Sequence, residues 1–195
     1  MLRIAVTGAI GSGKSTVLAA LARRGAAVMS CDAVVRRELA DNRRLQAALR
    51  RMYGEGIFHA GRLSRRRLAR LVFSDPARVA ALNRRVHPIV KRGVRAFFRK
   101  NRARRYAAVE VPLLFETDFY KLFDVTIGVA IGERLRRRRL REHGAAAEAA
   151  RRMRWQLSAR KKLARCDFII DNSGTRKEAY RKVKKLMEDV SWLKK

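Results

Sequence analysis

Apolar residues gather in five short runs along the chain, separated by longer amphipathic stretches. Runs that are short, apolar and rich in β-branched residues are typical of strands buried on both faces of a sheet. Helical patterns between them favour a parallel, doubly wound α/β sheet with helices on both faces. The predicted strands span 2–6, 26–29, 107–111, 125–129 and 168–171.

The long interval between the second and third runs carries helical patterns and no strand pattern. Gly, Pro, Ser and Asp interrupt it at 54–56, 74–76 and 87–88, where helices are expected to break. Its predicted helices span 43–53, 64–73, 76–86 and 88–100.

These patterns divide the chain into three parts. A helical insertion is expected over 36–105, and a second helical stretch over 133–162 looks like a lid. The remaining segments, 1–35, 106–132 and 163–195, form the predicted core.

A glycine-rich loop, VTGAIGSGKST, follows the first strand and leads into a helix predicted over 16–22. Gly8, Gly13, Lys14 and Ser15 fill the pattern G-x-x-x-x-G-K-[ST]. Glycines let backbone N–H groups turn inward around phosphate oxygens, and the following helix presents its amino end to them. Lys14 can reach the β- and γ-phosphates, and the Ser15 hydroxyl can ligate Mg²⁺. The loop predicts a site for a nucleoside triphosphate.

The net charge is +31 over 195 residues, and most of the excess lies in two stretches, 36–105 and 134–162. Such an excess can indicate a nucleic acid, a membrane surface or a polyphosphate substrate as partner. It can equally be a compositional habit, because Arg and Ala are both abundant. The basic stretches hold no nucleic-acid motif and few aromatic residues, so no specific nucleic acid is expected.

Localisation and assembly are constrained only weakly. No apolar run is long enough to cross a membrane, and the start of the chain lacks a signal-peptide pattern. Cys31 and Cys166 lie far apart, with no disulfide framework or zinc-ligand spacing around them. A cytoplasmic protein that does not bind membranes is expected. The sequence does not determine the oligomeric state, and a monomer is slightly favoured.

Phosphoryl transfer needs a carboxylate that takes the proton of the acceptor hydroxyl. Asp32 follows the second predicted strand, where open α/β sheets present functional groups. It suits that role, and it equally suits the N-cap of a helix over 33–39. The arginines of 134–141 can clamp a transferring phosphate or form a solvated helix face.

Several stretches together resemble the dephospho-coenzyme A kinase family nearly from end to end. They include the loop itself, CDAVVR after the second strand, VFSD, and LN leading to His87-Pro88. VPLLFE follows the third strand, and Gln156 with CDFIIDNSG lies near the end. His-Pro, PLLFE and D-x-x-I-x-N-x-G in this order are far more specific than the loop alone.

This resemblance implies a three-layer P-loop kinase fold with a helical acceptor-binding insertion and a lid. It implies transfer of the ATP γ-phosphate to the ribose 3′-hydroxyl of dephospho-coenzyme A, with Mg²⁺ on Ser15. The implied catalytic residues are Lys14, Asp32 as general base, Arg137 and Arg141. The implied ATP-binding residues are Gly8, Gly11, Ser12, Gly13, Lys14, Ser15, Thr16, Asn172 and Gly174. The implied acceptor-binding residues are Asp32, Arg36, His87, Pro88, Pro112, Leu113 and Glu116.

The pattern also has departures and alternatives. Ser30 stands where the family usually has the first Asp of D-x-D, Arg134 replaces a Gln, and Arg138 replaces a Leu. The lid is therefore more basic than the family pattern. A P-loop kinase with another acceptor, such as a nucleoside monophosphate, is the first alternative. A basic P-loop protein that binds nucleic acid is the second.

Overall fold

A computed structural model describes residues 1–189 of the chain, apart from the side chain of Glu148. The chain divides into two compact units, Met1–Ser30 with Phe97–Lys195, and Cys31–Ala96. The first unit holds a five-stranded sheet, and the second is mainly helical. They are described separately below.

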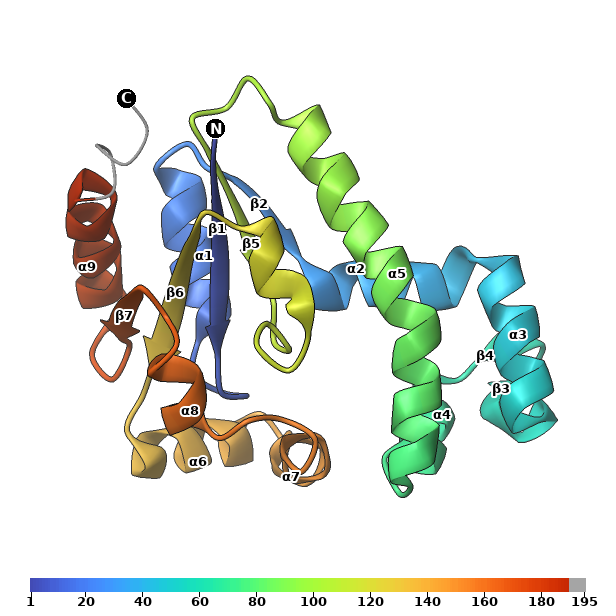
Figure 1. Cartoon of the computed structure of the whole chain (residues 1–195). Helices are drawn as coiled ribbons and strands as arrows, with labels where there is room; N and C mark the ends of the chain where they lie inside the picture. Colours follow the sequence, from blue (N-terminus) through green and yellow to red (C-terminus); the bar gives the residue numbers. More distant parts are fainter. Residues whose placement is uncertain (190–195) are drawn as a thin grey trace. The chain divides into compact units, whose positions relative to one another are not determined.

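The sheet of the first unit has the strand order β2-β5-β1-β6-β7, and every neighbouring pair is parallel (Figure 1). All five strands lie where the hydrophobic pattern predicts them, which confirms the predicted sheet. Their bounds are β1 Leu2–Gly8, β2 Ala27–Ser30, β5 Tyr106–Glu110, β6 Val125–Ala130 and β7 Phe168–Asp171.

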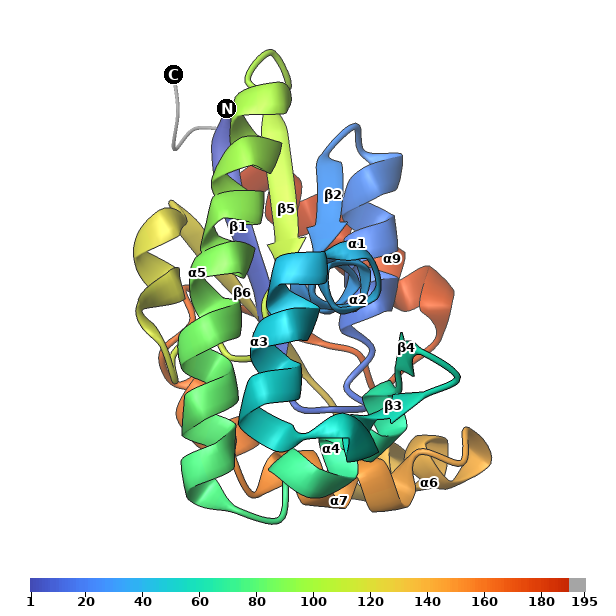
Figure 2. The same cartoon turned by 90° about the vertical axis from the view of Figure 1, so that its right-hand side faces the viewer.

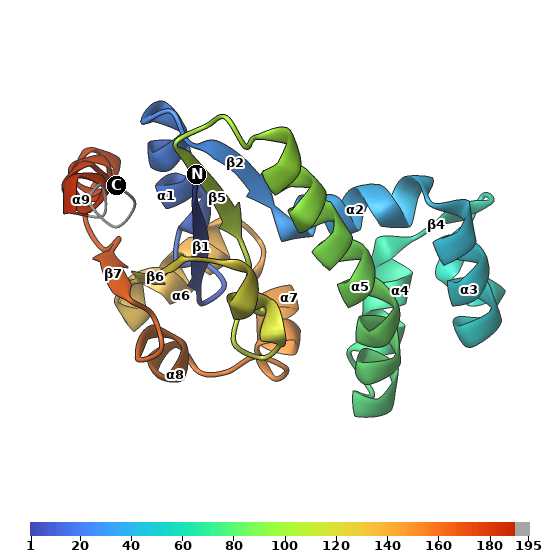
Figure 3. The same cartoon turned by 45° about the horizontal axis from the view of Figure 1, so that its top comes forward.

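One face of this sheet is covered by α1 (Lys14–Arg23) and α9 (Arg176–Asp189), as Figure 3 shows. Alternate residues of the strands point to this face. Ile4 and Val6 of β1 therefore join Leu21 of α1 and Val183 of α9 in one buried cluster. Burial of each such side chain contributes about 1.5–3 kcal/mol, so this cluster is a main source of the unit's stability.

The other face of the sheet carries α8 (Ala159–Leu163), also visible in Figure 3. Gly128 of β6 points toward this side, opposite to its neighbours Ile127 and Val129, which lie in the first cluster. A Cβ atom at Gly128 would lie 2.7 Å from Leu163 Cδ2 and 3.0 Å from Cys166 Sγ. Glycine therefore lets this segment approach the sheet closely.

Three further helical segments complete the first unit. They are the 3₁₀ helix η2 (Asp118–Leu122), α6 (Glu133–Glu142) and α7 (Ala146–Met153). The stretch 133–162 is thus largely helical, and its action as a lid stays a prediction. Among residues 1–189, no helix is both long and apolar enough to span a bilayer.

The second unit, whose elements are labelled in Figure 2, consists of five helical segments and a small hairpin. Asn42 and Ser64 cap two of its helices by accepting hydrogen bonds from the Leu45 and Arg67 backbone N–H groups. The elements are α2 Cys31–Asp41, α3 Arg43–Tyr53, η1 Glu55–Ile57, β3 Phe58–His59, β4 Arg62–Leu63, α4 Arg65–Val72 and α5 Pro76–Lys100, whose last turn belongs to the first unit.

The predicted break at His87-Pro88 is wrong, because α5 continues through Pro88. Proline has no N–H, so the carbonyl of Arg84 lacks its usual helical donor. A stripe of buried valines crosses this position at helical spacing and offsets that loss. The stripe consists of Val79, Val86, Val90 and Val94.

The hairpin β3–β4 was not predicted, since the insertion was expected to hold no strand. Its two turn residues, Ala60 and Gly61, have φ angles of 46° and 73°. Two-residue hairpin turns require such positive φ values, and Asn or Asp usually precedes the glycine. Ala60 occupies that position here, so the sequence signal is missing.

The close approach at Gly128 is testable by substitution. We expect Gly128→Ala to destabilise the protein by about 1–3 kcal/mol, because the added methyl group overlaps Leu163 and Cys166. Gly132→Ala is the control, since its Cβ would meet nothing closer than Ser173 Oγ at 4.0 Å. That change should cost about 0.5 kcal/mol, the usual loss at an N-cap. Equal urea midpoints for the two variants would contradict this packing.

Candidate active site

The glycine-rich loop joins the carboxyl end of β1 to the amino end of α1, in the middle of the sheet. β1 lies between β5 and β6, so polar groups at the ends of both neighbours can approach the loop. Gly13 precedes α1 in the left-handed conformation, with φ 83° and ψ 32°. No side chain caps this helix. Its first N–H groups are therefore suited to bind an anion.

Lys14 lies inside the loop, and only 7% of the residue is exposed. Its Nζ donates to the carbonyl oxygens of Gly8 at 3.3 Å and Ala9 at 3.1 Å. The carboxylate of Glu110, at the end of β5, lies 3.9 Å from Nζ. A buried ammonium held this way is placed to exchange carbonyl contacts for phosphate oxygens.

Asn172, just after β7, supports the loop from the side. The residue is 3% exposed, and its Nδ2 donates to the Ser12 carbonyl oxygen at 2.8 Å. Its backbone N–H donates to the Ala130 carbonyl, which continues the pairing of β6 and β7. A Cβ atom at Gly13 would overlap this amide nitrogen, so both the left-handed φ and the contact require glycine there.

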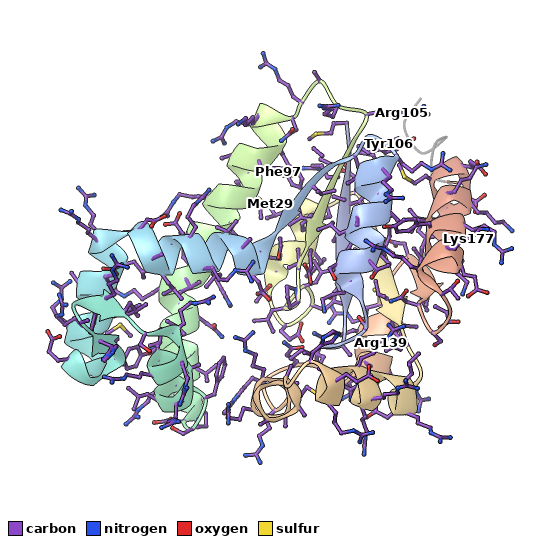
Figure 4. The ribbon with its side chains drawn as sticks, turned by 180° about the vertical axis from the view of Figure 1, so that it is seen from behind. Met29, Phe97, Arg105, Tyr106, Arg139 and Lys177 are labelled. Atoms are coloured by element: carbon purple, nitrogen blue, oxygen red, sulfur yellow. The ribbon has the colours of Figure 1, made fainter. Side chains whose placement is uncertain are left out.

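Two arginines of α6 also reach the loop. Arg136, 7% exposed, donates from Nη1 to the Ile10 carbonyl oxygen at 3.3 Å. Arg139 donates from Nη2 to the Asn172 carbonyl oxygen at 3.3 Å. Figure 4 shows Arg139 beside the amino end of α1. α6 therefore contacts the phosphate loop directly through Arg136 and contacts Asn172, which supports the loop, through Arg139.

Glu133 orients Arg136 at the start of α6. Its carboxylate accepts from Arg136 Nε at 2.9 Å and Nη2 at 2.7 Å, and from Arg137 Nε at 2.8 Å. The hydrogen bond from Arg136, followed by that from Arg137, lowers the pKa of Glu133 to about 2. The carboxylate therefore stays ionised well into the acid range.

The predicted catalytic arginines lie elsewhere on this helix. Arg137 is exposed and pairs with Glu133, and Arg141 is exposed near the end of α6. Their catalytic role stays a prediction.

The remaining loop residues are placed in different ways. Ser15 is exposed in the first turn of α1, where its hydroxyl is accessible to a metal ion, and Thr16 is half-buried. The Ser12 hydroxyl is buried and would press on a Cβ atom at Gly8. A Cβ atom at Gly11 would meet Leu140 and Arg136. Gly174 is exposed.

Mg²⁺ commonly takes one or two protein oxygens together with substrate phosphates and water. The exposed Ser15 hydroxyl, beside the uncapped start of α1, is suited to be one such protein oxygen. Residues 1–189 hold no cluster of three His, Cys, Asp or Glu side chains that could bind a metal by itself.

The predicted acceptor residues fall into both units. In the second unit, Asp32 and Arg36 are exposed and lie one turn apart on α2. His87 is half-buried and Pro88 is exposed in α5. Because α2 begins at Cys31, Asp32 lies within the first turn and the predicted cap before a helix at 33–39 is wrong. A carboxylate in the first turn is stabilised by the helix dipole.

In the first unit, the predicted acceptor residues Pro112, Leu113 and Glu116 lie in the segment after β5. The Leu113 carbonyl accepts from Thr117 Oγ1 at 2.7 Å, which closes this segment on itself. Glu116 pairs with the buried Lys162, with 2.9 Å between Oε1 and Nζ.

Comparisons with known proteins identify the family of this chain. The family model described as dephospho-CoA kinase matches residues 2–178. The chain belongs to the dephospho-CoA kinase family. The family resemblance predicted from the motifs is therefore confirmed, and the protein is an ATP-dependent kinase of coenzyme A biosynthesis.

Individual relatives agree with the family assignment over nearly the whole chain. A dephospho-CoA kinase of Thermobifida fusca is 34% identical over 193 residues, covering 97% of this chain and 96% of its own. A solved structure from Thermus thermophilus is 35% identical, covers 97% of both chains and has a TM-score of 0.82. The Campylobacter jejuni dephospho-CoA kinase, 21% identical with a TM-score of 0.63 and 96% coverage of both chains, shares the fold.

Sequence reasoning missed three cations that the structure places in buried or half-buried contacts. Arg136 and Arg139 stand in a run of four arginines, and nothing in the run distinguishes the residues that turn inward. Lys162 likewise follows Arg160 and Lys161. Only the direction of each side chain in the folded helix separates them.

The ion pairs at Glu133 predict a specific titration. We expect an NMR titration of this carboxyl group to give a midpoint near pH 2 in the wild type. Arg136→Met should move the midpoint toward the ordinary value, because the largest cause of the low pKa is removed.

Arg138→Met is the matched control, since Arg138 pairs with Glu142 at 2.7 Å instead. The pKa of Glu133 is lower in the folded protein than in the unfolded chain. Its pairing with Arg136 and Arg137 therefore stabilises the folded protein at pH values above the ordinary pKa of a glutamate. The contribution is lost as the pH falls from the ordinary value toward about 2. An unchanged midpoint in Arg136→Met would contradict the arrangement.

Proposed function

We propose that this protein transfers the γ-phosphate of ATP to the ribose 3′-hydroxyl of dephospho-coenzyme A and so completes coenzyme A. The observation that carries the proposal is the loop around Lys14, in a chain that the dephospho-CoA kinase model matches over residues 2–178. The alternatives with another acceptor or a nucleic acid are not favoured by any observation.

On the ATP side, we propose that the loop backbone and Lys14 hold the β- and γ-phosphates. Ser15 would hold Mg²⁺, which would supply positive charge toward these phosphates. Gly8, Gly11, Ser12, Gly13 and Thr16 contribute the surrounding loop, and Asn172 and Gly174 border the nucleotide. The exposed Arg137 and Arg141 then meet the γ-phosphate as it transfers.

On the acceptor side, we propose that the insertion, 36–105, binds dephospho-coenzyme A, with the lid, 133–162, covering ATP. Arg36, His87 and Pro88 contact the acceptor together with Pro112, Leu113 and Glu116. The Asp32 carboxylate accepts the proton of the 3′-hydroxyl. The oxygen bonds to the γ-phosphorus as the bond to the β-phosphate oxygen breaks, and ADP leaves.

We further propose that the enzyme works in the cytoplasm as a monomer without a specific nucleic-acid partner. Both substrates carry several phosphates, and the basic excess of the chain gives it a favourable charge toward them.

An acceptor panel tests the proposed reaction. ADP release should require Mg²⁺ and appear with dephospho-coenzyme A, but not with adenosine, AMP, CMP or shikimate. Lys14→Ala is the negative control and should lose turnover along with most of its ATP affinity. Turnover with a rival acceptor alone would reject the proposed substrate while leaving the phosphate loop in place.

Asp32 provides the sharpest test of the chemical step. We expect Asp32→Asn to lower kcat by roughly 10²–10⁴-fold, because an amide cannot accept the hydroxyl proton. ATP affinity should stay unchanged.

Asp41→Asn is the matched control at the other end of α2, where the carboxylate is also exposed. It should leave kcat unchanged. Equal kcat values for Asp32→Asn and the wild type would remove Asp32 from the mechanism.

A further inference from the structure

Lys162 is the most deeply buried charged side chain in residues 1–189, with 1% of the residue exposed. Its ammonium has three donor positions, and three acceptors surround it. Nζ donates to the Pro112 carbonyl oxygen at 2.5 Å and to Gln156 Oε1 at 3.1 Å, and it pairs with Glu116 Oε1 at 2.9 Å. Every donor is therefore used.

These contacts join two segments that are distant in the sequence. Pro112 and Glu116 follow β5, whereas Gln156 and Lys162 lie at the carboxyl end of the stretch predicted to be a lid. The Leu157 backbone N–H also donates to Glu116 Oε1, at 2.8 Å. The ammonium thus sits at the junction of the acceptor segment and the end of the lid.

Arg165, which is exposed, also contacts the segment after β5. Its Nη1 donates to the Phe115 carbonyl oxygen at 3.3 Å, and its guanidinium lies 4.6 Å from the centre of the Phe115 ring. Backbone or side-chain groups of Pro112, Phe115 and Glu116 are therefore all held from the segment 156–165.

The two carboxylate oxygens of Glu116 have different environments. Oε1 accepts both contacts from the lid side. Oε2 is buried and has no hydrogen-bond partner among the described residues. A buried carboxylate oxygen without a partner is costly, so it is a suitable acceptor for a donor group of a ligand.

We propose that Lys162 is a positioning residue for the acceptor. It holds Pro112 and Glu116 in place, so that Glu116 Oε2 faces the dephospho-coenzyme A site while Oε1 stays tied to the end of the lid. The proposal rests on the proposed function, which assigns Pro112, Leu113 and Glu116 to acceptor binding.

The chemistry of the cluster agrees with a positioning role. Burying an ion pair rarely stabilises a protein more than apolar residues of the same size would. Three acceptors at fixed directions around one ammonium do define a geometry that apolar packing cannot reproduce. The phosphate loop has separate supports in Asn172, Arg136 and Arg139. Loss of Lys162 should therefore affect the acceptor and leave ATP binding intact.

Lys162→Met tests this inference, with Lys161→Met as the matched control. The two lysines are adjacent on α8, but Lys161 is exposed. Steady-state kinetics with both substrates should show the KM for dephospho-coenzyme A raised on the order of 10- to 100-fold in Lys162→Met. The KM for ATP should stay within about twofold, as expected when one substrate's interactions are lost selectively. Lys161→Met should match the wild type.

Arg165→Met provides a milder variant that is expected to fold, because Arg165 is exposed. It should shift the acceptor KM in the same direction by a smaller factor. Thermal midpoints of all three variants separate lost stability from lost positioning. A folded Lys162→Met with an unchanged acceptor KM, or a parallel rise in both KM values, would overturn the inference. No wild-type turnover with dephospho-coenzyme A would instead reject the proposed function itself.

Discussion

The central constraint on this structure is that β1 is buried on both faces and paired on both edges. A strand in that position has to be largely apolar, and its loop has to emerge in the middle of the sheet. The neighbours β5 and β6 then deliver Glu110 and Ala130 to the same edge, and β7 delivers Asn172. The position of the phosphate loop, and of every group that supports it, follows from the burial of this one strand.

The composition limits how cations can be paired, because the chain has 48 Lys and Arg residues but only 17 Asp and Glu residues. The buried or half-buried cations meet this shortage by using main-chain carbonyl oxygens. Lys14, Arg136, Arg139 and Lys162 each donate to at least one carbonyl. Carbonyl groups at loops and helix ends lack internal partners, so they are available acceptors. Lys14, Arg136 and Lys162 each pair with a glutamate as well, so the carbonyl groups supplement the few carboxylates at these sites.

The sequence predicts the sheet and the loop because both depend on local patterns. Apolar runs locate all five strands, and the glycine-lysine spacing locates the phosphate loop. It fails at Pro88, where a valine stripe outweighs a local breaker, and at Ala60, where a turn forms without its usual residue. It also fails to distinguish Arg136 from Arg137 and Lys162 from Lys161, since neighbouring residues of one type differ only in the direction they point. Tertiary packing decides those directions, and the local sequence pattern does not predict them.

The order of the strands also bears on how the chain is synthesised. Leu2 of β1 pairs with Tyr106 of β5, so the first strand leaves the ribosome long before its partner exists. The second unit, Cys31–Ala96, is contiguous and is completed during that interval. Long-range parallel pairing is slow, whereas contiguous helical units fold quickly and as units. The helical insertion can therefore fold while β1 is still an unpaired apolar segment, and such a segment is prone to aggregation.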